Sequence, residues 1–438
     1  PSVNRYQTDK VFLEYADSLY RTPMRWNDTV EFQILKGNVK FRQAGMWMYC
    51  DSAYYYPTLN SLDAFSRVRM EQGDTLFAYA DKIFYNGDIR MAQLRCGPSE
   101  PKVRLINRNV TLTTDSLDYD ISMELGWYAY GGKIDDDVNT LTSIYGEYSP
   151  ASKNADFYHD VVLVNNRDGF TMLTDTLYYN TNTHLARIVS PTKIQGANDT
   201  ILTKSGIYDT RAGDARLTAR STIIHRDSNN NITTLEGDSI IYDKATRISR
   251  AYMFRGPDKH PLPMVLTDTA HKSVLTGGFG LYNDSTREAW AAEYPMLMEY
   301  SQTDTIFLRA DTIKTCIMTE KVWPDSLKTT VDSLLASLNA LEQLEAAARV
   351  TRPAAITPQA PDSLNLSPRD SLLALMPDSA LLTDKEFHVA WAYNHGRFFR
   401  QDLQGVADTL VFVERDSMLY MVHNDHSEFP ILVLLRTS

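Results

Sequence analysis

The sequence predicts an all-β protein, built as an elongated stack of antiparallel strand units with one helical and disordered insertion. A short motif recurs along the chain: an aspartate and a hydroxyl residue are followed by an apolar residue and, two positions later, by an aromatic one. The chain also holds 25 Tyr and 16 Phe, and aromatic and β-branched side chains favour strands. Turns rich in Asn and Gly separate the motifs, which is typical of short antiparallel strands.

The motif defines the repeating unit. Its copies recur about every 33 residues, within the period range of repeat proteins. A second short strand, such as Gly37–Phe41, precedes many copies, so that each unit consists of strand, turn, strand and turn. The clearest copies begin at Asp51, Asp81, Asp115, Asp175, Asp238 and Asp408.

Each strand of the unit has one apolar side. In the copy at Asp115, Leu117 and Tyr119 share one face, whereas Ser116 and Asp118 share the other, because side chains alternate across a strand. A single unit cannot bury its apolar side alone, but stacked units can. The alternation therefore predicts an array with an inside and an outside.

An insertion interrupts the strand pattern. Leucines recur at helical spacing, and a run rich in Pro and Ser (352–377) follows them and predicts a linker or disorder. We divide the chain into an array at 11–320, the insertion at 321–385, and a resumed β repeat at 386–438 whose last unit we expect to be incomplete. The leucines of the expected helix are Leu334, Leu335, Leu338, Leu341 and Leu344.

Charge and hydropathy exclude several classes of protein. The net charge is −11 and no Lys/Arg cluster exceeds a pair, so we expect neither nucleic-acid binding nor a polybasic contact with a membrane surface. No apolar run approaches the roughly 20 residues of a membrane-spanning helix. The sequence begins at Pro1 without a signal-like segment, as expected of a mature secreted protein.

No pattern in the sequence indicates catalysis, a metal or a cofactor. Zinc-protease, phosphate-loop and nucleophile-elbow motifs are missing from it. His423 and His426 fall in a polar run that we interpret as a solvated turn, and we interpret the run 135–137 of three aspartates as a turn. One motif aspartate per unit cannot supply the 6–8 converging oxygens that calcium needs, so we expect each to accept hydrogen bonds from turn amides. We predict that the protein is not an enzyme.

The three cysteines, Cys50, Cys96 and Cys316, show no metal-ligand spacing. A disulfide between Cys50 and Cys96 and burial of both as small apolar residues remain open, and we favour burial.

Several strings resemble a known family. Gly37–Gln43 (GNVKFRQ), Met48–Tyr56 (MYCDSAYYY) and Leu112–Asp120 (LTTDSLDYD) resemble the OstA-like proteins of organic-solvent tolerance. The lipopolysaccharide-transport bridge protein and the N-terminal domain of its outer-membrane partner belong to this family. The resemblance is most specific over residues 11–134.

The resemblance implies a V-shaped β-jellyroll, open at both ends, whose apolar groove holds the acyl chains of lipopolysaccharide or a related glycolipid. It implies a location in the periplasm, with outer-membrane association left open. It also implies end-to-end β-augmentation with other envelope transport proteins or with further copies of the chain. The lipid-binding positions would be Val39, Phe41, Ala53, Tyr55, Ile83, Tyr85, Leu117 and Tyr119 and, by repeat position, Leu177, Tyr179, Ile240 and Tyr242.

Two other functions remain in competition. An apolar stripe inside a β stack is normally packed core, and the protein would then be a structural or assembly scaffold of the envelope with a dry interior. An enzyme that acts on polysaccharides has only the three aspartates at 135–137 in its favour. A groove wide enough for acyl chains would separate the carrier from the scaffold.

Overall fold

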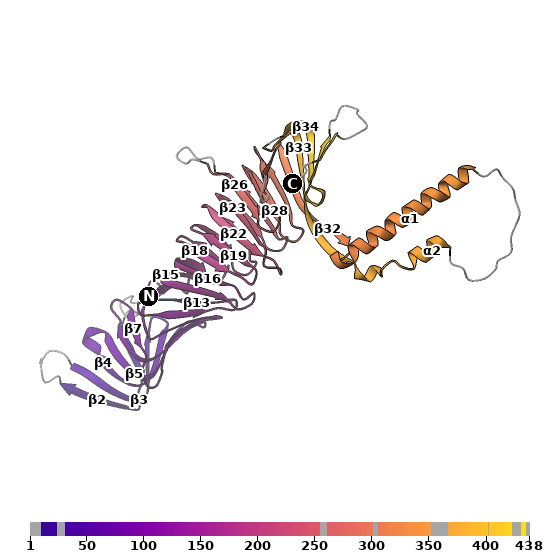
Figure 1. Cartoon of the computed structure of the whole chain (residues 1–438). Coiled ribbons are helices and arrows are strands. Elements are labelled where there is room, and N and C mark those ends of the chain that lie inside the picture. The colour runs from indigo at the N-terminus through magenta and orange to yellow at the C-terminus, as the bar shows by residue number, and fades with distance from the viewer. Residues whose placement is uncertain are drawn as a thin grey trace, which may run out of the picture. The chain divides into compact units, whose positions relative to one another are not determined.

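The computed structural model describes residues 10–23, 31–254, 261–300, 305–351, 367–401, 403–422 and 431–434. The chain divides into two compact units. The first contains residues 1–314 and 392–407, and the second contains residues 315–391 and 408–438. Nearly all of the first unit is antiparallel β structure (Figure 1), so the predicted fold class is confirmed.

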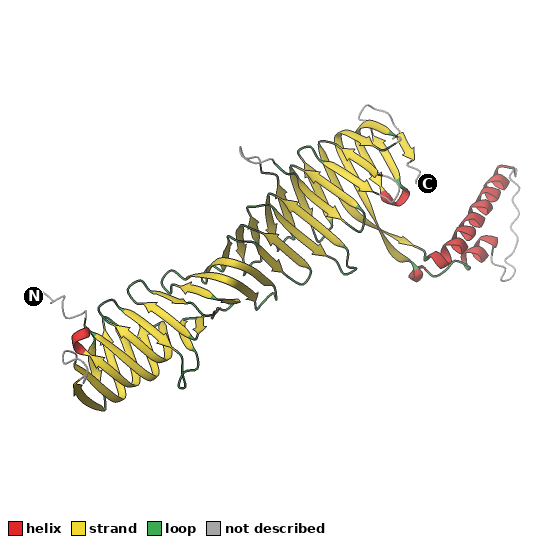
Figure 2. Ribbon diagram, turned by 60° about the vertical axis from the view of Figure 1, so that its left-hand side comes forward, coloured by secondary structure: helices red, strands yellow, loops and turns green. Residues whose placement is uncertain are grey.

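The strands of the first unit form two rows, which we call row A and row B, and within each row every strand pairs with its neighbours (Figure 2). Row A holds β2 (Ser18–Pro23), β7 (Met91–Arg95), β10 (Ser116–Asp120), β11 (Leu125–Tyr128), β14 (Tyr145–Tyr148), β17 (Leu185–Ile188), β20 (Gly206–Asp209), β21 (Ala215–Leu217), β24 (Ser239–Asp243), β25 (Ile248–Tyr252), β28 (Phe279–Asn283) and β29 (Glu288–Ala292).

Row B holds β1 (Phe12–Tyr15), β8 (Val103–Asn107), β9 (Val110–Thr114), β12 (Gly132–Asp135), β13 (Asn139–Ser143), β18 (Thr192–Gln195), β19 (Asp199–Thr203), β22 (Ser221–Arg226), β23 (Ile232–Gly237), β26 (Met264–Asp268), β27 (Ser273–Gly277), β30 (Met296–Tyr300) and β31 (Thr305–Arg309). Six longer strands contribute to both rows: β3 (Glu31–Gln43), β4 (Met46–Tyr56), β5 (Ser61–Gln72), β6 (Leu76–Asn86), β15 (Asn154–Asn165) and β16 (Thr171–Asn180).

Bends in the chain connect the two rows. In β15 the register with β16 shifts between Tyr158 and Val161, and the residues between them, His159 and Asp160, have φ values of 64° and 52°. Two consecutive residues in this left-handed region turn the strand sharply, as a β-bulge does. Each bend therefore sends one strand half into row A and the other into row B.

The aspartate of the repeat motif lies at these bends. Asp81 accepts a hydrogen bond from the backbone N–H of Ser99 at 3.0 Å, as expected for a carboxylate that satisfies turn amides. At Asp51 an ion pair with Arg67, at 2.8 Å, takes this role instead. The motif thus marks the point where the chain changes row.

The far ends of the row A strands close in a recurring turn. The Asn180 Oδ1 atom accepts hydrogen bonds from the backbone N–H groups of Asn182 and Thr183 at 3.1 and 2.9 Å, and His184 completes the turn with a φ of 57°. Asp120 opens an equivalent turn with the same two bonds. An Asn or Asp that accepts from the amides following it is a common turn device, and it fixes where each strand ends.

The core lies between the two rows, which face each other. Inward side chains on both rows are almost completely buried, among them Leu105 in row B and Leu117 in row A. A methyl group added at Gly280 in row A would lie 2.5 Å from the Met264 side chain in row B. The rows are therefore in contact through their inward side chains.

The second unit contains the predicted helix. Helix α1 (Asp325–Thr351) includes all five leucines of the helical pattern, and α2 (Pro368–Leu373) is joined to it by an Arg369–Glu342 ion pair of 2.9 Å. The short α2 was not predicted, and residues 352–366 of the expected linker lie outside the described residues. None of the described helices is both long and apolar enough to cross a bilayer.

The C-terminal strands follow these helices. β32 (Thr312–Val322), β33 (Thr383–Phe399) and β34 (Gln404–Val413) each have residues in both units. Within the second unit, β34 pairs with β35 (Met418–Val422), which pairs with β36 (Ile431–Leu434). The positions of His423 and His426, predicted to lie in a solvated turn, fall outside the described residues.

Cys50 and Cys96 form no disulfide, but only Cys50 is buried as the favoured interpretation required, whereas Cys96 is half-buried. Cys50 is buried, and its burial raises the pKa of the thiol to about 12. A thiol with so high a pKa is a poor nucleophile near neutral pH.

The packing of the two rows makes a stability prediction. Leu163 on β15 is 0% exposed, whereas Leu173 on the adjacent β16 is 44% exposed. Leu163→Ala should lower the free energy of unfolding by about 2–5 kcal/mol, and Leu173→Ala by about 0.5 kcal/mol or less. Urea unfolding followed by circular dichroism would measure both, and equal losses would contradict the assignment of an inside and an outside.

Candidate functional site

The twelve predicted lipid-binding residues all point between the two rows. Ten of them are buried, with side chains no more than 3% exposed, whereas Tyr55 and Tyr242 are half-buried. Val39 and Phe41 belong to row B and the other ten to row A. In this structure the space around them is filled by protein, so a lipid would reach them only where the rows separate.

The inward tyrosines form a ladder along row A. In the strand register, Tyr85 faces Ala92, Ala92 faces Tyr119, and Tyr119 faces Gly126. The alternation of a tyrosine with a small residue continues along the row. Its later members are Tyr148, Ala155, Tyr179, Ala186, Tyr208, Ala215, Tyr242, Ser249, Tyr282 and Ala289.

A small residue on each side leaves room for a tyrosine ring, because directly opposed Cβ atoms on paired strands lie only about 4.5–5.5 Å apart. Four tyrosines of the ladder, Tyr85, Tyr119, Tyr179 and Tyr242, were predicted from the sequence to face inward, but their small partners were not. A signal was present, since each small residue lies on the strand that returns from the turn after a tyrosine.

The phenol tips of this ladder bond to row B. Tyr85 donates to Gln43 Oε1 at 2.6 Å, and Tyr119 donates to Gln72 Oε1 at 3.3 Å. Both amides end a row B strand at the side far from the bends. Burial raises the pKa of both phenols, so they remain protonated donors. These bonds close the side of the array that lies opposite the bends, and we call this closed side the seam.

We call each tyrosine of the ladder, together with the row B residue opposite its hydroxyl, a rung. In two further rungs the row B amide donates to the tyrosine hydroxyl instead. Asn107 Nδ2 lies 3.1 Å from the Tyr148 hydroxyl, and Asn139 Nδ2 lies 2.7 Å from that of Tyr179. All four amides were missed from the sequence, because nothing local distinguishes a turn Asn or Gln that faces inward.

Ion pairs continue the seam. Arg211 Nη2, in a row A turn, lies 2.6 Å from Asp137 Oδ2 in a row B turn. Lys244 Nζ, also in a row A turn, lies 2.7 Å from Asp168 Oδ2 in a row B turn. The Lys244 ammonium lowers the pKa of Asp168. Ion pairs that are partly exposed contribute about 0–1 kcal/mol each, so none of them locks the seam alone.

His225 bridges the seam between two carboxylates. Its Nδ1 atom lies 2.6 Å from Asp199 and its Nε2 atom 2.9 Å from Asp284. Hydrogen bonds to both carboxylates raise the pKa of the imidazole to about 9. At neutral pH the ring is therefore protonated on both nitrogens, donates a hydrogen bond to Asp199 and forms an ion pair with Asp284.

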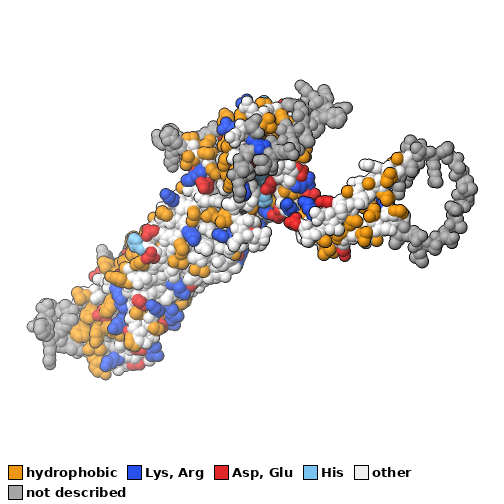
Figure 3. Space-filling view, viewed as in Figure 1, with side chains coloured by type: hydrophobic (Ala, Val, Ile, Leu, Met, Phe, Trp, Pro, Cys, Tyr) orange, Lys and Arg blue, Asp and Glu red, His pale blue; other side chains and the backbone are white. Residues whose placement is uncertain are grey.

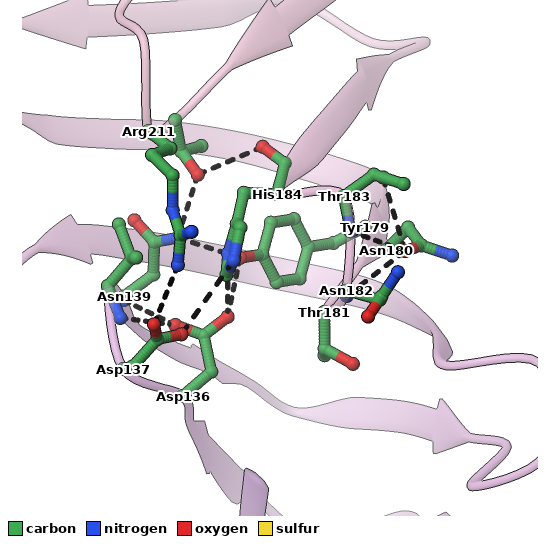
Figure 4. Close-up of polar contacts among 12 residues, drawn as sticks. Asp136, Asp137, Asn139, Tyr179, Asn180, Thr181, Asn182, Thr183, His184 and Arg211 are labelled. Carbon is green, nitrogen blue, oxygen red and sulfur yellow. Dashed lines mark hydrogen bonds and ion pairs between the residues drawn. The ribbon is translucent and has the colours of Figure 1, made fainter. Parts of the chain in front are cut away.

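A buried polar network lies under the seam near His184 (Figure 4). The Asp136 side chain is 0% exposed. Its Oδ1 atom accepts from the backbone N–H groups of Val138 and Asn139 at 2.7 and 2.6 Å, and its Oδ2 atom accepts from the Tyr179 hydroxyl at 2.5 Å. The run 135–137 thus forms a turn, as interpreted from the sequence, and also anchors this network, which the sequence did not reveal.

Two clusters bring potential metal ligands together. The ligand atoms of Asp136, Asp137 and His184 lie within 4.8 Å of one another, as do those of Asp199, His225 and Asp284. In the first cluster, Asp136 already accepts three hydrogen bonds from protein donors. In the second, a protonated His225 forms ion pairs with both carboxylates, and Arg247 forms a further one with Asp284 at 2.7 Å. Hydrogen bonding within the protein accounts for both arrangements, and the expectation of no metal stays a prediction.

Comparison with known proteins assigns the N-terminal part of the array to a family. A family model described as OstA-like protein matches residues 8–172. Residues 8–172 are OstA-like. The family predicted from Gly37–Gln43 and its companion strings is thereby confirmed. The OstA-like segment contains β1 to β15, the first bends and the first rungs of the tyrosine ladder.

No curated protein matches the chain. The OstA-like family is one of transport and structural proteins of the cell envelope rather than of enzymes.

The bridge at His225 makes a pH prediction. Because the folded pKa of about 9 exceeds the ordinary value of 6.5, the bridge should contribute its full stability below pH 6.5 and lose it as the pH rises through 9. His225→Gln should therefore lower the melting temperature at pH 6 and have little effect at pH 10. Thermal unfolding between pH 5 and 10 measures this.

His159→Asn is the matched control, because the His159 side chain is 67% exposed and Asn tolerates its left-handed backbone. Its effect on the melting temperature should not change with pH. A deficit of the His225 variant that is constant from pH 5 to 10 would exclude a titrating bridge.

Proposed function

We propose that this OstA-like protein carries lipopolysaccharide or a related glycolipid across the periplasm toward the outer membrane, with its acyl chains between rows A and B. The observation that supports this proposal is the inward apolar side of the array, which continues from strand to strand through the OstA-like segment and beyond it. The association of the family with lipopolysaccharide-transport bridge proteins supports the choice of ligand.

The free energies involved are compatible with carriage. A buried acyl chain of 14 carbons gains about 10 kcal/mol, at ~0.8 kcal/mol per methylene. A hydrogen bond of the seam contributes about 1 kcal/mol and a partly exposed ion pair about 0–1 kcal/mol. Breaking the polar contacts of one or two rungs of the seam therefore costs less than one enclosed acyl chain gains, provided that the acyl chain replaces the apolar contacts that the two rows lose there.

The repetition of the interior favours movement over fixed binding. Each rung offers a similar apolar surface, so a lipid meets no single deep site along the row. The tyrosines suit the seam, because each combines an apolar ring with a polar tip that bonds at the edge.

The dense packing of the interior favours a second function, that of a structural scaffold of the envelope with a dry core. Side chains such as Leu117 and Leu177 are 0% exposed. In a scaffold the seam would stay closed, and the row A turns would not move to admit a ligand.

Photocrosslinking separates the two functions. A diazirine analogue of leucine at Leu117 or Leu177 should crosslink to lipopolysaccharide in a carrier, because both side chains point between the rows. The same analogue at the outward Leu173, and a photoreactive residue at the outward Asp118, should not crosslink. A folded protein that crosslinks at neither inward position would favour the scaffold.

We also propose that the array joins other envelope proteins, or further copies of itself, end to end. Among the described strands, β1 and β2 each pair on one side only, with β3. Large apolar side chains gather at this end (Figure 3), including Tyr15 at 54%, Leu19 at 47% and Tyr20 at 56% exposure. An unpaired strand edge with apolar side chains is suited to β-augmentation.

Sedimentation velocity tests this assembly. The sedimentation coefficient should rise with protein concentration, and Tyr20→Lys should suppress the rise, because a charge on an edge strand opposes pairing. Tyr130→Lys should leave the rise unchanged, since Tyr130 is 86% exposed and lies in a turn of another rung. A strict monomer at high concentration would exclude assembly of copies.

A further inference from the structure

A polar pocket interrupts the seam next to the His184 network. It has a volume of about 220 Å³ and lies between row A turns and row B turns. Arg108 and Asp137 line it from row B, and Lys153, His184 and Arg211 line it from row A. We call it the seam pocket.

Cations outnumber anions in the seam pocket. Asp137 is the one carboxylate among its lining residues. This carboxylate is engaged, because its Oδ2 atom lies 2.6 Å from Arg211 and its Oδ1 atom accepts from Asn109 Nδ2 at 3.3 Å. Among the described residues, no carboxylate lies within ion-pair distance of Arg108 or Lys153. Two positive charges of the pocket are therefore not neutralised by a salt bridge.

The positive charges act on each other. Partial burial and then the charge of Arg108 lower the pKa of Lys153, and only Glu124 acts in the opposite direction. Asp136 lies beneath the pocket but has no exposed side-chain surface and is occupied by its own hydrogen bonds. Bringing two like charges together without a counterion is unfavourable, so an anion between Arg108 and Lys153 would be stabilised.

Hydrogen bonds and backbone conformation fix the two turns that carry these cations. Arg108 and Lys153 have φ values of 56° and 62°, which fixes them in tight turns. Lys153 donates its N–H to Ser149 and accepts from Thr181, both at 2.9 Å. Asn107 Nδ2 donates to the carbonyl oxygen of Pro150 at 3.1 Å and so ties the two turns together. The turns that carry Arg108 and Lys153 are thus fixed by contacts within the protein.

We infer that the seam pocket binds a phosphate group through Arg108 and Lys153. Its volume equals that of several water molecules at ~30 Å³ each, which accommodates a phosphate monoester. The Asn182 side chain adds an amide donor to the lining, whereas the Thr181 hydroxyl already donates to the carbonyl oxygen of Lys153 at 3.1 Å. The phosphate can belong to a lipid headgroup or be free in solution.

The position of the seam pocket favours a lipid headgroup as the source of the phosphate, and this choice of source rests on the proposed function. The pocket opens at the seam, directly outside the inward row that includes Tyr148 and Tyr179. A phosphorylated glycolipid could place its phosphate in the pocket while its acyl chains lie between the rows. The pocket would then select anionic glycolipids over neutral ones.

Binding assays on the full chain test the inference. The variant is Arg108→Gln with Lys153→Gln, which removes both charges. The control is Lys193→Gln with Lys204→Gln, which removes two exposed charges from another part of the array. Each protein is titrated with a phosphorylated disaccharide glycolipid, with the same lipid after enzymatic removal of its phosphates, and with inorganic phosphate.

The pocket variant should bind the phosphorylated lipid at least tenfold more weakly than the unaltered protein and the control variant do. All three proteins should bind the dephosphorylated lipid equally. Inorganic phosphate should broaden its ³¹P signal with the unaltered protein and not with the pocket variant, which would establish the phosphate site even if no lipid binds.

Equal binding of the phosphorylated lipid by all three proteins would overturn the proposed phosphate site. Crosslinking of lipopolysaccharide at Leu117 would then show whether the proposed carrier function still holds. If the pocket variant also loses the dephosphorylated lipid, the two charges act on the fold of the seam and not on a phosphate.

Discussion

The structure depends on the alternation of tyrosine with alanine, glycine or serine across row A. A tyrosine ring fills the space beside its small neighbours, and the hydroxyls of Tyr85, Tyr119, Tyr148 and Tyr179 bond to the opposite row. In these rungs one residue type therefore provides both the apolar filling and the polar closure. Because the pattern repeats with the strand register, a one-residue slip would turn the ring outward and leave the Gln or Asn of row B without its bond.

Many weak contacts close the seam, so one part of it can open without the rest. Each rung adds one or two hydrogen bonds or an ion pair to the seam, and rungs contact only their neighbours. In such quasi-one-dimensional proteins, a local opening leaves distant units intact. The same interior can thus be a packed core where the seam is closed and a lipid-accessible surface where it is open, so packed core and groove are not exclusive descriptions.

The sequence was informative where the signal is local and periodic. Alternation within Asp115–Tyr119 predicted which side chains point inward, and the leucine spacing predicted α1. The bridge at His225 and the network at Asp136 could not be predicted, because their partners lie 26 to 59 residues away and meet only when the two rows face each other. The seam pocket was missed for the same reason, since Arg108, Lys153 and Arg211 come from three separate turns.

The chemistry of the seam changes along the array. The rungs near the N-terminus are closed by uncharged bonds, such as Tyr85 to Gln43, whereas later rungs are closed by charged pairs, such as Lys244 with Asp168. Dissolved ions weaken the second kind of contact far more than the first. The two ends of one continuous repeat therefore respond differently to salt. The seam gives the array a direction along its length, although the apolar interior is uniform.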